Sequence, residues 1–315
     1  MYAIGHKSKE SASVKSLDHT KADNEKLSVL ACFKHDQIKT NSRKGNRTMK
    51  RTNKKEIYAR YGIEYKAGKI NAPVFGWIRP LLVDGNKKIG KGAYHYSTLP
   101  TTQIFHVEIN GRSYDVKGTC PCSCVGCYAT KGNYNFPSVI KSLAIKTILT
   151  REFIDFVERA IRAQIEADKI ELLRIHASGY FINIDHALMF ARIAKDFPCV
   201  KFWTYTKRKE CEVCFDGIDN ANIVKSTING YGFNFGHCDY IMSVYKYLIS
   251  KGKKVHICFC GVEQAAGVET KHCTNCKCCS ECEYVLFLEH STEYKAESDP
   301  LFMELVKLVM NQRYQ

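Results

Sequence analysis

The sequence contains no hydrophobic run long enough to cross a membrane. A spanning helix needs roughly 18 or more consecutive apolar residues. No segment approaches that length, although 45% of the 315 residues are hydrophobic and can build a sizeable core. The first seven residues also lack the apolar segment of a secretory signal peptide. The sequence therefore predicts a cytoplasmic protein without a membrane partner.

Acidic residues are scarce relative to basic ones. The chain has 47 Lys and Arg against 32 Asp and Glu, a formal net charge of +15, and residues 34–60 hold ten basic residues against two acids. Such a segment can neutralise phosphates, which predicts a nucleic-acid partner. A solvated, flexible leader explains the same composition. No aromatic residue precedes Tyr58 in this segment, so it lacks a platform on which unpaired bases could stack.

No H-x-x-x-H pair accompanies the 16 cysteines. In a small secreted protein so many cysteines would predict disulfides, but in a cytoplasmic chain of this size their clustering predicts metal binding or catalysis. Ligation by thiolates alone favours an iron–sulfur cluster or a four-thiolate zinc site.

The composition predicts three regions. Residues 1–55 are polar and poorly periodic and are expected to form a flexible basic extension. Residues 56–260 are expected to form an α/β core that carries the first cysteine cluster. Residues 261–315 are expected to form a cysteine-rich segment and a C-terminal helix that pack on this core.

Strand and helix patterns alternate along the core. Helical periodicity covers residues 138–150, 152–168, 184–195, 239–250 and 300–313, and strand patterns cover residues 171–176, 200–205, 222–227 and 255–259. An Asn-Gly pair within residues 105–116 predicts a hairpin. Repeated β-α units imply a parallel sheet with right-handed crossovers. The predicted fold is α/β, either a partial (β/α) barrel or an open parallel sheet.

The first cysteine cluster consists of Cys120, Cys122, Cys124 and Cys127. Without Cys122, the other three have the spacing C-x3-C-x2-C. Three thiolates can hold three irons of a 4Fe–4S cluster and leave the fourth iron open to a ligand. Cys122 could instead close the cluster, and a zinc site held by all four thiolates is the alternative.

The second cysteine cluster follows the predicted strand 255–259. One thiol from the strand end and a C-x2-C-x2-C run supply four ligands, and hence a closed site for an auxiliary iron–sulfur cluster or zinc. The predicted ligands of this second site are Cys260, Cys273, Cys276 and Cys279. Possible alternate ligands are Cys122 in the first site and Cys258, Cys278 and Cys282 in the second.

Two predicted strands end in residues suited to ligand binding. His176, Ser178 and Gly179 follow one strand, and Lys207 follows the next. Ligands of parallel α/β folds bind at the carboxyl ends of the strands. These four residues are therefore predicted to line a ligand or cofactor site. The alternative to a ligand role is that His176 is simply a buried core residue and Lys207 simply a surface residue.

The C-x3-C-x2-C spacing ahead of β-α repeats resembles the radical S-adenosylmethionine enzymes. In that superfamily the open iron binds S-adenosylmethionine, whose reductive cleavage yields a deoxyadenosyl radical. The end of the second strand contacts the methionine amino group there, and the turn at Ser178 and Gly179 stands at the matching place. The resemblance implies S-adenosylmethionine as a cofactor and an electron donor as a partner.

A second resemblance is to the bacteriophage family known as gene product eighty-eight, over about residues 80–280. It implies a phage or prophage origin, hence the cytoplasm of a bacterial host, and carries no established activity. The sequence departs from the family at Tyr180, where an acidic residue is common, at Cys122, where small residues are common, and in the additional hairpin 105–117. The resemblance rests on five stretches in order: 85–91 with 97–100, 120–129, 174–179, 205–207 and the late C-x2-C-x2-C run.

The sequence thus predicts an iron–sulfur protein of radical S-adenosylmethionine type, with one open and one auxiliary cluster. The alternative is a metal-stapled protein without catalysis that binds nucleic acid through residues 34–60 or senses redox state. No residue pattern identifies a substrate or a catalytic side chain.

Overall fold

The computed structural model describes residues 53–85, 89–122, 127–228, 232–233, 235–258, 276, 278–288 and 300–313. The chain divides into two units, Met1–Thr48 and Met49–Gln315. All described residues belong to the second unit.

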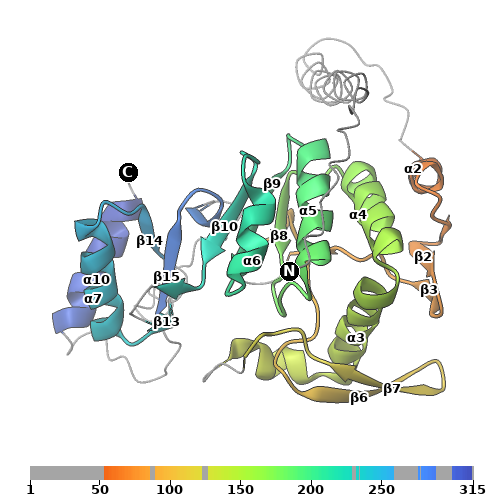
Figure 1. The fold of residues 1–315 in the computed structure, drawn as a ribbon, viewed down its shortest axis with the longest axis horizontal. Helices are drawn as coiled ribbons and strands as arrows, with labels where there is room; N and C mark the ends of the chain where they lie inside the picture. Colours follow the sequence, from red (N-terminus) through yellow and green to blue (C-terminus); the bar gives the residue numbers. More distant parts are fainter. Residues whose placement is uncertain are drawn as a thin grey trace, which may run out of the picture. The chain divides into compact units, whose positions relative to one another are not determined.

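A five-stranded sheet forms the centre of this unit (Figure 1). Its strand order is β10-β9-β8-β5-β4, and the four strands from β5 to β10 run parallel, whereas β4 pairs antiparallel with β5. The parallel strands therefore lie side by side in the order in which they occur in the chain. Their bounds are Val83–Asp84 for β4, Ala93–Tyr96 for β5, Leu172–Ile175 for β8, Lys201–Thr206 for β9 and Ala221–Lys225 for β10.

Helices connect the parallel strands. Two helices, α3 (Pro137–Glu152) and α4 (Ile154–Asp168), lie between β5 and β8, α5 (Ile184–Asp196) lies between β8 and β9, and α6 (Lys209–Glu212) lies between β9 and β10. Local sequence sets their ends. Proline at the first position favours the start of α3, because the helix needs no N–H there. The Asn183 side chain caps α5 by accepting a hydrogen bond from the backbone of His186.

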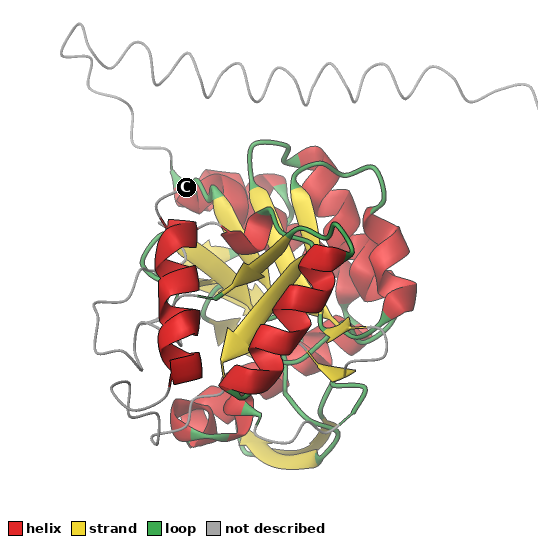
Figure 2. Ribbon diagram, turned by 90° about the vertical axis from the view of Figure 1, so that its left-hand side faces the viewer, coloured by secondary structure: helices red, strands yellow, loops and turns green. Residues whose placement is uncertain are grey.

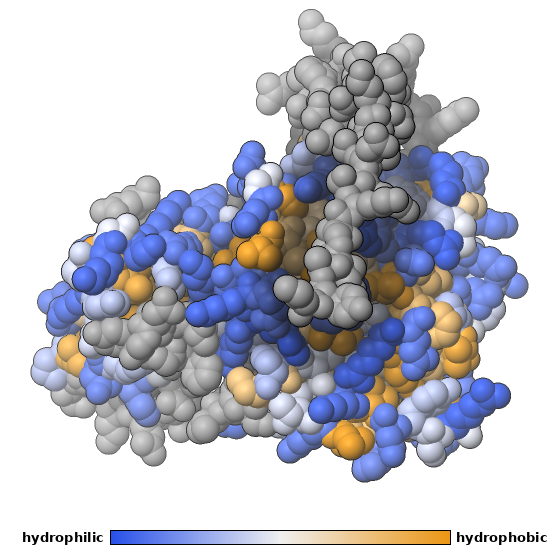
Figure 3. Space-filling view, viewed as in Figure 1, coloured by the Kyte–Doolittle hydropathy of each residue, from blue (hydrophilic) through white to orange (hydrophobic). Residues whose placement is uncertain are grey.

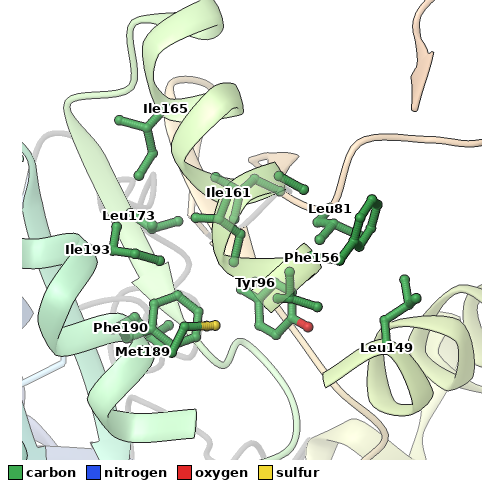
Figure 4. Packing of buried hydrophobic residues seen from close by; sticks show 14 of the residues in the cluster. Leu81, Tyr96, Leu149, Phe156, Ile161, Ile165, Leu173, Met189, Phe190 and Ile193 are labelled. Carbon is green, nitrogen blue, oxygen red and sulfur yellow. The ribbon is translucent and has the colours of Figure 1, made fainter. Parts of the chain in front are cut away.

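The main hydrophobic core lies between the sheet and helices α3, α4 and α5. Alternate residues of the strands, such as Tyr96, Leu173 and Phe202, point into it. Figure 4 shows the side chains of Leu173 and Tyr96 meeting Ile161 and Phe190 from the helices. These side chains are almost completely buried, and their burial is the main stabilising term for this part of the fold.

The opposite face of the sheet contacts the cysteine-rich segment. Ala93, Leu172 and Trp203 form a second, smaller core with the side chains of Tyr205 and Cys279 packed against it. The strand residues of this set alternate with those of the main core. Both faces of the sheet are therefore covered, as parallel sheets require.

A separate three-stranded parallel sheet carries the C-terminal part of the unit. Its order is β13-β15-β14, formed by Phe235–Gly236, Tyr284–Leu288 and Val255–Ile257. Helices α7 (Cys238–Ser250) and α10 (Pro300–Arg313) share a hydrophobic core with it. Figure 2, turned by 90° from Figure 1, shows the strands of the unit between flanking helices.

Several shorter elements complete the described structure. The hairpin of β6 (Ile104–Ile109) and β7 (Arg112–Lys117) turns at Asn110 and Gly111, both with positive φ, as an Asn-Gly turn requires. The others are α2 (Lys54–Arg60), β1 (Tyr65–Lys66), β2 (Lys69–Ala72), β3 (Gly76–Ile78), β11 (Thr227–Ile228), β12 (Gly232–Phe233) and the 3-10 turns η2 (Tyr128–Thr130), η3 (Gly132–Asn135), η4 (Val213–Phe215) and η5 (Cys278–Ser280).

The surface seen in Figure 3 is mostly hydrophilic, with separate hydrophobic patches, one of them at the lower right, where Figure 1 places α3 and the hairpin. Ile104 and Phe136, from these parts of the chain, have more than half of their surface exposed. In the part of the chain that the structure describes, no helix is both long and apolar enough to span a membrane.

The structure confirms a mixed α/β fold with a parallel sheet and a cysteine-rich C-terminal region. The predicted hairpin, five helices and four strands are present, with ends shifted by a few residues. Several strands were not predicted, among them β5, which begins the parallel series, and β15, which pairs with β14 away from the main sheet. Within the described ranges the strands form separate sheets and do not close into a barrel.

Candidate functional site

The carboxyl ends of β5, β8, β9 and β10 lie at one edge of the sheet, because these strands are parallel and adjacent. We call this the carboxyl edge. Ser97 follows β5, His176 follows β8, Lys207 follows β9 and Ser226 follows β10. The predicted ligand residues therefore come from neighbouring strand ends.

The first cysteine cluster is anchored at the carboxyl edge. The backbone N–H groups of Thr119 and Cys120 donate to the carbonyls of Leu99 and Thr101, which follow β5. In return, the N–H of Thr101 donates to the sulfur of Cys120 at 3.1 Å. A Cβ on Gly118 would lie 2.1 Å from the Pro100 oxygen, so only glycine permits this close approach of the two segments.

The turn at Ser178 and Gly179 packs against the same anchor. The Ser178 hydroxyl donates to the Thr98 carbonyl, and the backbone N–H of Tyr180 donates to the Thr119 hydroxyl, each at 2.9 Å. A Cβ on Gly179 would lie 2.1 Å from the Thr98 hydroxyl, and the φ of this glycine is +75°. The space that Gly179 leaves free is therefore filled by two side chains of the protein itself, Thr98 and Thr119.

His176 lies in the core behind the carboxyl edge. It is 4% exposed, and its ring packs edge-on against Phe181 and His186. Neither ring nitrogen has a hydrogen-bond partner within the described residues. The pKa of His176 is held well below its usual range. Burial is the largest cause, and the positive charges that His186 and Arg174 can carry add to it. Its backbone has a φ of +62°, a strained value for a non-glycine residue.

Lys207 lies close to the first cysteine cluster. Its ammonium nitrogen lies 3.9 Å from the Cys122 sulfur and 5.8 Å from the centre of the Tyr180 ring. The structure thus brings together Lys207, the cysteine loop and the residue that follows Gly179. An ammonium group in this position is suited to attract an anionic group of a ligand.

Polar groups also lie on the sheet face opposite the helices, from Arg174, Tyr205 and His95. The Arg174 guanidinium stacks on the Tyr205 ring at 5.1 Å. His95, from β5, hydrogen-bonds with Ser97 at 3.2 Å. Burial, followed by the charges of Lys146 and Arg174, lowers the pKa of His95 to about 3, so this imidazole is neutral at physiological pH.

The second cysteine cluster contains a compact group of donor atoms. One nitrogen of His256, on β14, and the sulfurs of Cys276 and Cys278 all lie within 4.8 Å of one another. His256 is 5% exposed, and both cysteines are half-buried. The pKa of Cys276 lies below its usual range, because its sulfur accepts a hydrogen bond from the Cys278 thiol and lies beside the His256 imidazole. The same hydrogen bond and burial raise the pKa of Cys278. One negative charge is thus favoured here.

Three more cysteines pack together with Cys278. Cys258, Cys278, Cys279 and Cys282 pack in or against one small hydrophobic cluster with Val224 and Val285. The Asn222 side chain, on β10, donates to the carbonyls of Cys279 and Cys282. Burial and then the adjacent Cys279 raise the pKa of Tyr205. The second cysteine cluster is therefore in contact with the main sheet.

Three of the predicted metal ligands fall outside the described ranges. Cys124, Cys260 and Cys273 lie outside the described residues. Cys127, which follows that gap in the first cluster, is half-buried. The metal-ligand and cofactor assignments therefore remain predictions.

The basic segment 34–60 is described from residue 53 onward. There, Lys54 pairs with Asp168 and Arg60 pairs with Glu166, both acids on α4. This part of the segment belongs to the folded unit. Nucleic-acid binding by the segment remains a prediction.

His256 and Arg174 were not predicted as site residues. The pattern His256-Ile-Cys258 at a strand end contained a signal, because alternate strand residues point to the same side. The same alternation could have indicated Arg174 as a site residue, because it lies two residues before His176. His95 had none, because its strand was not predicted.

Part of the chain is similar to a known protein family. Residues 80–228 match the model of the family described as Gene product 88. No curated protein and no solved structure gives a significant match to the chain. The matched region contains the parallel strands, the first cysteine cluster and the Ser178–Gly179 turn. This part of the chain, just under half of its length, is therefore similar to the Gene product 88 family.

Proposed function

We propose that this chain is an iron–sulfur enzyme similar to radical S-adenosylmethionine enzymes. In this proposal Cys120, Cys124 and Cys127 hold an open 4Fe–4S cluster at the carboxyl edge. The observation that carries the proposal is the convergence of the first cysteine cluster, the Ser178–Gly179 turn and Lys207 at the ends of sequential parallel strands.

The donor set fits such a cluster. The thiols of Cys120 and Cys127 are half-buried, so they are accessible to metal yet partly shielded from water. The Cys120 sulfur accepts a backbone N–H, and hydrogen bonds to cluster sulfurs are one means by which proteins tune cluster potentials. When bound, an open cluster supplies an iron that can chelate a ligand and transfer one electron to it.

The chain's own residues have positioning roles in this proposal. Thr98 and Thr119 fix the turn at Gly179 against the cysteine loop, through hydrogen bonds of 2.9 Å between their hydroxyls and from the Tyr180 N–H. Lys207 provides positive charge for the carboxylate of an amino-acid ligand. His176, enclosed by aromatic rings, forms part of the wall that supports this edge. An external electron donor is required.

The C-terminal cysteines form a second metal centre in this proposal. The sequence assigns it to Cys260, Cys273, Cys276 and Cys279 as an auxiliary cluster, with zinc as the alternative metal. The gathering of the described thiols around η5 supports a metal here.

The proposal is tested by purifying the full chain under strictly anaerobic conditions and measuring iron, zinc and acid-labile sulfide. We expect at least about four irons and matching sulfide per chain, and retention of S-adenosylmethionine in equilibrium dialysis. Cys124→Ala should remove the open cluster and this binding.

A matched control is Cys214→Ser, in the C-x2-C pair of α6 and η4. The Cys214 thiol lies 4.0 Å from the carbonyl of Glu210, one helical turn earlier. This variant should keep iron and S-adenosylmethionine binding. Zinc without iron or sulfide would overturn the iron–sulfur proposal and favour a metal-stapled protein without catalysis.

A further inference from the structure

The His256 imidazole lies close enough to two thiols of the second cysteine cluster to share one metal ion with them. Its Nε2 atom is 4.0 Å from the Cys276 sulfur, and the Cys278 sulfur completes a triangle in which no pair of donor atoms exceeds 4.8 Å. We propose that His256, Cys276 and Cys278 are ligands of a single zinc ion. This assigns a mixed imidazole–thiolate centre where the sequence predicted ligation by thiolates alone.

The donor separations favour one ion over an iron–sulfur cube. With Zn–S bonds of about 2.3 Å and Zn–N bonds of about 2.1 Å, the donors of a tetrahedral zinc lie about 3.5–3.8 Å apart. In a 4Fe–4S cluster each thiolate binds a different iron, which spreads the cysteine sulfurs much farther apart. A triangle within 4.8 Å needs little contraction to hold zinc but considerable expansion to hold a cube.

The fold holds the histidine rigidly. His256 is the central residue of β14 and stands opposite Val285 in the register with β15. Val255 and Ile257, on either side of it, are buried in the C-terminal core. A ligand on a strand buried in this way has little rotational freedom to lose when metal binds.

A fourth thiol, that of Cys282, follows the triangle in the chain. Cys282 is 8% exposed and follows Cys278 by one turn, with its backbone N–H donating to the Cys278 carbonyl at 3.0 Å. Cys278 packs against the small hydrophobic cluster that contains Cys282. Four protein ligands close a zinc site, and closed zinc sites are structural. The ion would thus tie the η5 segment to β14.

The inference refines the second centre of the proposed function but does not depend on the open cluster. The first cysteine cluster and the His256 group share no residue, so the two ideas can fail separately. About four irons with about one zinc per chain would support both. One zinc without iron would support only the zinc site, and about eight irons without zinc would support only the iron–sulfur proposal.

The decisive experiment measures metal content and cobalt spectra of the full chain. Cobalt(II) exchanged into the centre should give intense sulfur-to-cobalt charge-transfer absorption and the visible bands of tetrahedral geometry. Outer-shell changes cost about 10–100-fold in metal affinity, so His256→Ala, which removes a ligand, should weaken zinc binding by more than about 100-fold. Cys276→Ser should have a comparable effect.

Two controls separate ligation from general damage to the fold. His106→Ala removes an exposed histidine on the hairpin, paired with Asp115, and should leave zinc and the cobalt spectrum unchanged. His256→Cys keeps a ligand in place, so it should retain zinc and shift the cobalt bands as one more thiolate binds. Unchanged zinc affinity and cobalt spectrum in His256→Ala would overturn the proposal, as would loss of metal in His256→Cys with α/β circular dichroism intact.

Discussion

The ammonium nitrogen of Lys207 lies 3.9 Å from the sulfur of Cys122, although 85 positions separate the two residues in sequence. This contact joins the end of β9 to the first cysteine cluster. It also places Cys122 differently from Cys120, whose sulfur accepts the backbone N–H of Thr101. The two thiols are thus expected to differ in role.

Replacement of Cys122 should leave the open cluster in place. The three-cysteine spacing omits this residue, and its sulfur faces a lysine side chain. Cys122→Ser should therefore retain iron and sulfide after anaerobic purification, whereas Cys120→Ser should lose most of both. Equal loss in the two variants would show that Cys122 is a ligand and that the cluster is closed.

Lys207 should contribute to ligand affinity without affecting cluster content. An ammonium group that contacts a carboxylate contributes about 1.5–3 kcal/mol through a charged hydrogen bond. Lys207→Ala should therefore weaken S-adenosylmethionine binding at least about tenfold, as measured by equilibrium dialysis of the iron-loaded protein. Lys209→Ala, which removes an exposed lysine two residues later on α6, is the control and should bind normally. Equal affinity in the two variants would remove Lys207 from the ligand site.

Acid should destabilise the fold through its buried histidines. Burial lowers the pKa of His186 to about 3, whereas in the unfolded chain it is about 6.5. The unfolded state therefore binds a proton below pH 6.5 that the folded state does not bind until about pH 3. The stability from this residue is complete above pH 6.5 and is lost as the pH falls toward 3.

The variant His186→Phe tests this linkage. Its neighbours Tyr96, Phe181 and Phe190 are aromatic and suit a phenyl ring. Between about pH 6 and 4, its unfolding free energy should change with pH less steeply than that of the parent, by about 1.4 kcal/mol per pH unit. Urea unfolding at several pH values gives the slopes. An unchanged slope would mean that His186 is protonated in the folded state.

Sequence periodicity was sufficient to locate much of the framework of the site. Helices α3, α4 and α5 have apolar residues at helical spacing, and β8 and β9 are short apolar runs, so their types and order were predictable. The carboxyl edge followed from that order. The strand β5 was missed because Ala93–Tyr96 has only four residues and no clear alternation. Its pairing with β8 defines it as a strand.

The contacts around the turn at Gly179 could not be predicted. Spacing suggested that a ligand approaches this glycine, but Thr98 and Thr119 occupy the space beside it. These threonines lie about 80 and 60 positions away in sequence, and no local pattern indicates such a pairing. The contact between His256 and Cys276 could not be predicted for the same reason, because only the fold brings these two residues together. Cysteine spacing predicts that a metal binds but does not reveal which thiols lie beside the His256 imidazole.

The nucleic-acid prediction can be tested with a deletion that spares the ion pairs to α4. Lys54 and Arg60 form ion pairs with α4, so a deletion of residues 34–52 keeps these contacts while removing seven of the ten basic residues. If the segment neutralises phosphates, duplex DNA affinity should fall, and the slope of log affinity against log salt should decrease by about 0.9 for each lost phosphate contact. Filter binding at several salt concentrations measures both. A parent affinity that does not vary with salt would rule out this role.

Gly179→Ala should destabilise the protein more than an alanine at another glycine with the same φ. Gly179 and Gly111 both have a φ of +75°, so alanine carries a similar backbone cost at each, about 1–2 kcal/mol. At Gly111 nothing lies within 4 Å of the added Cβ, whereas at Gly179 it would overlap Thr98 and Thr119. This overlap should add about 1–3 kcal/mol. Urea unfolding of the two variants gives the difference directly, and equal destabilisation would mean that the Thr98–Thr119 anchor moves aside at little cost. Because that anchor also positions the cysteine loop, Gly179→Ala should lower iron content as well, while Gly111→Ala should not.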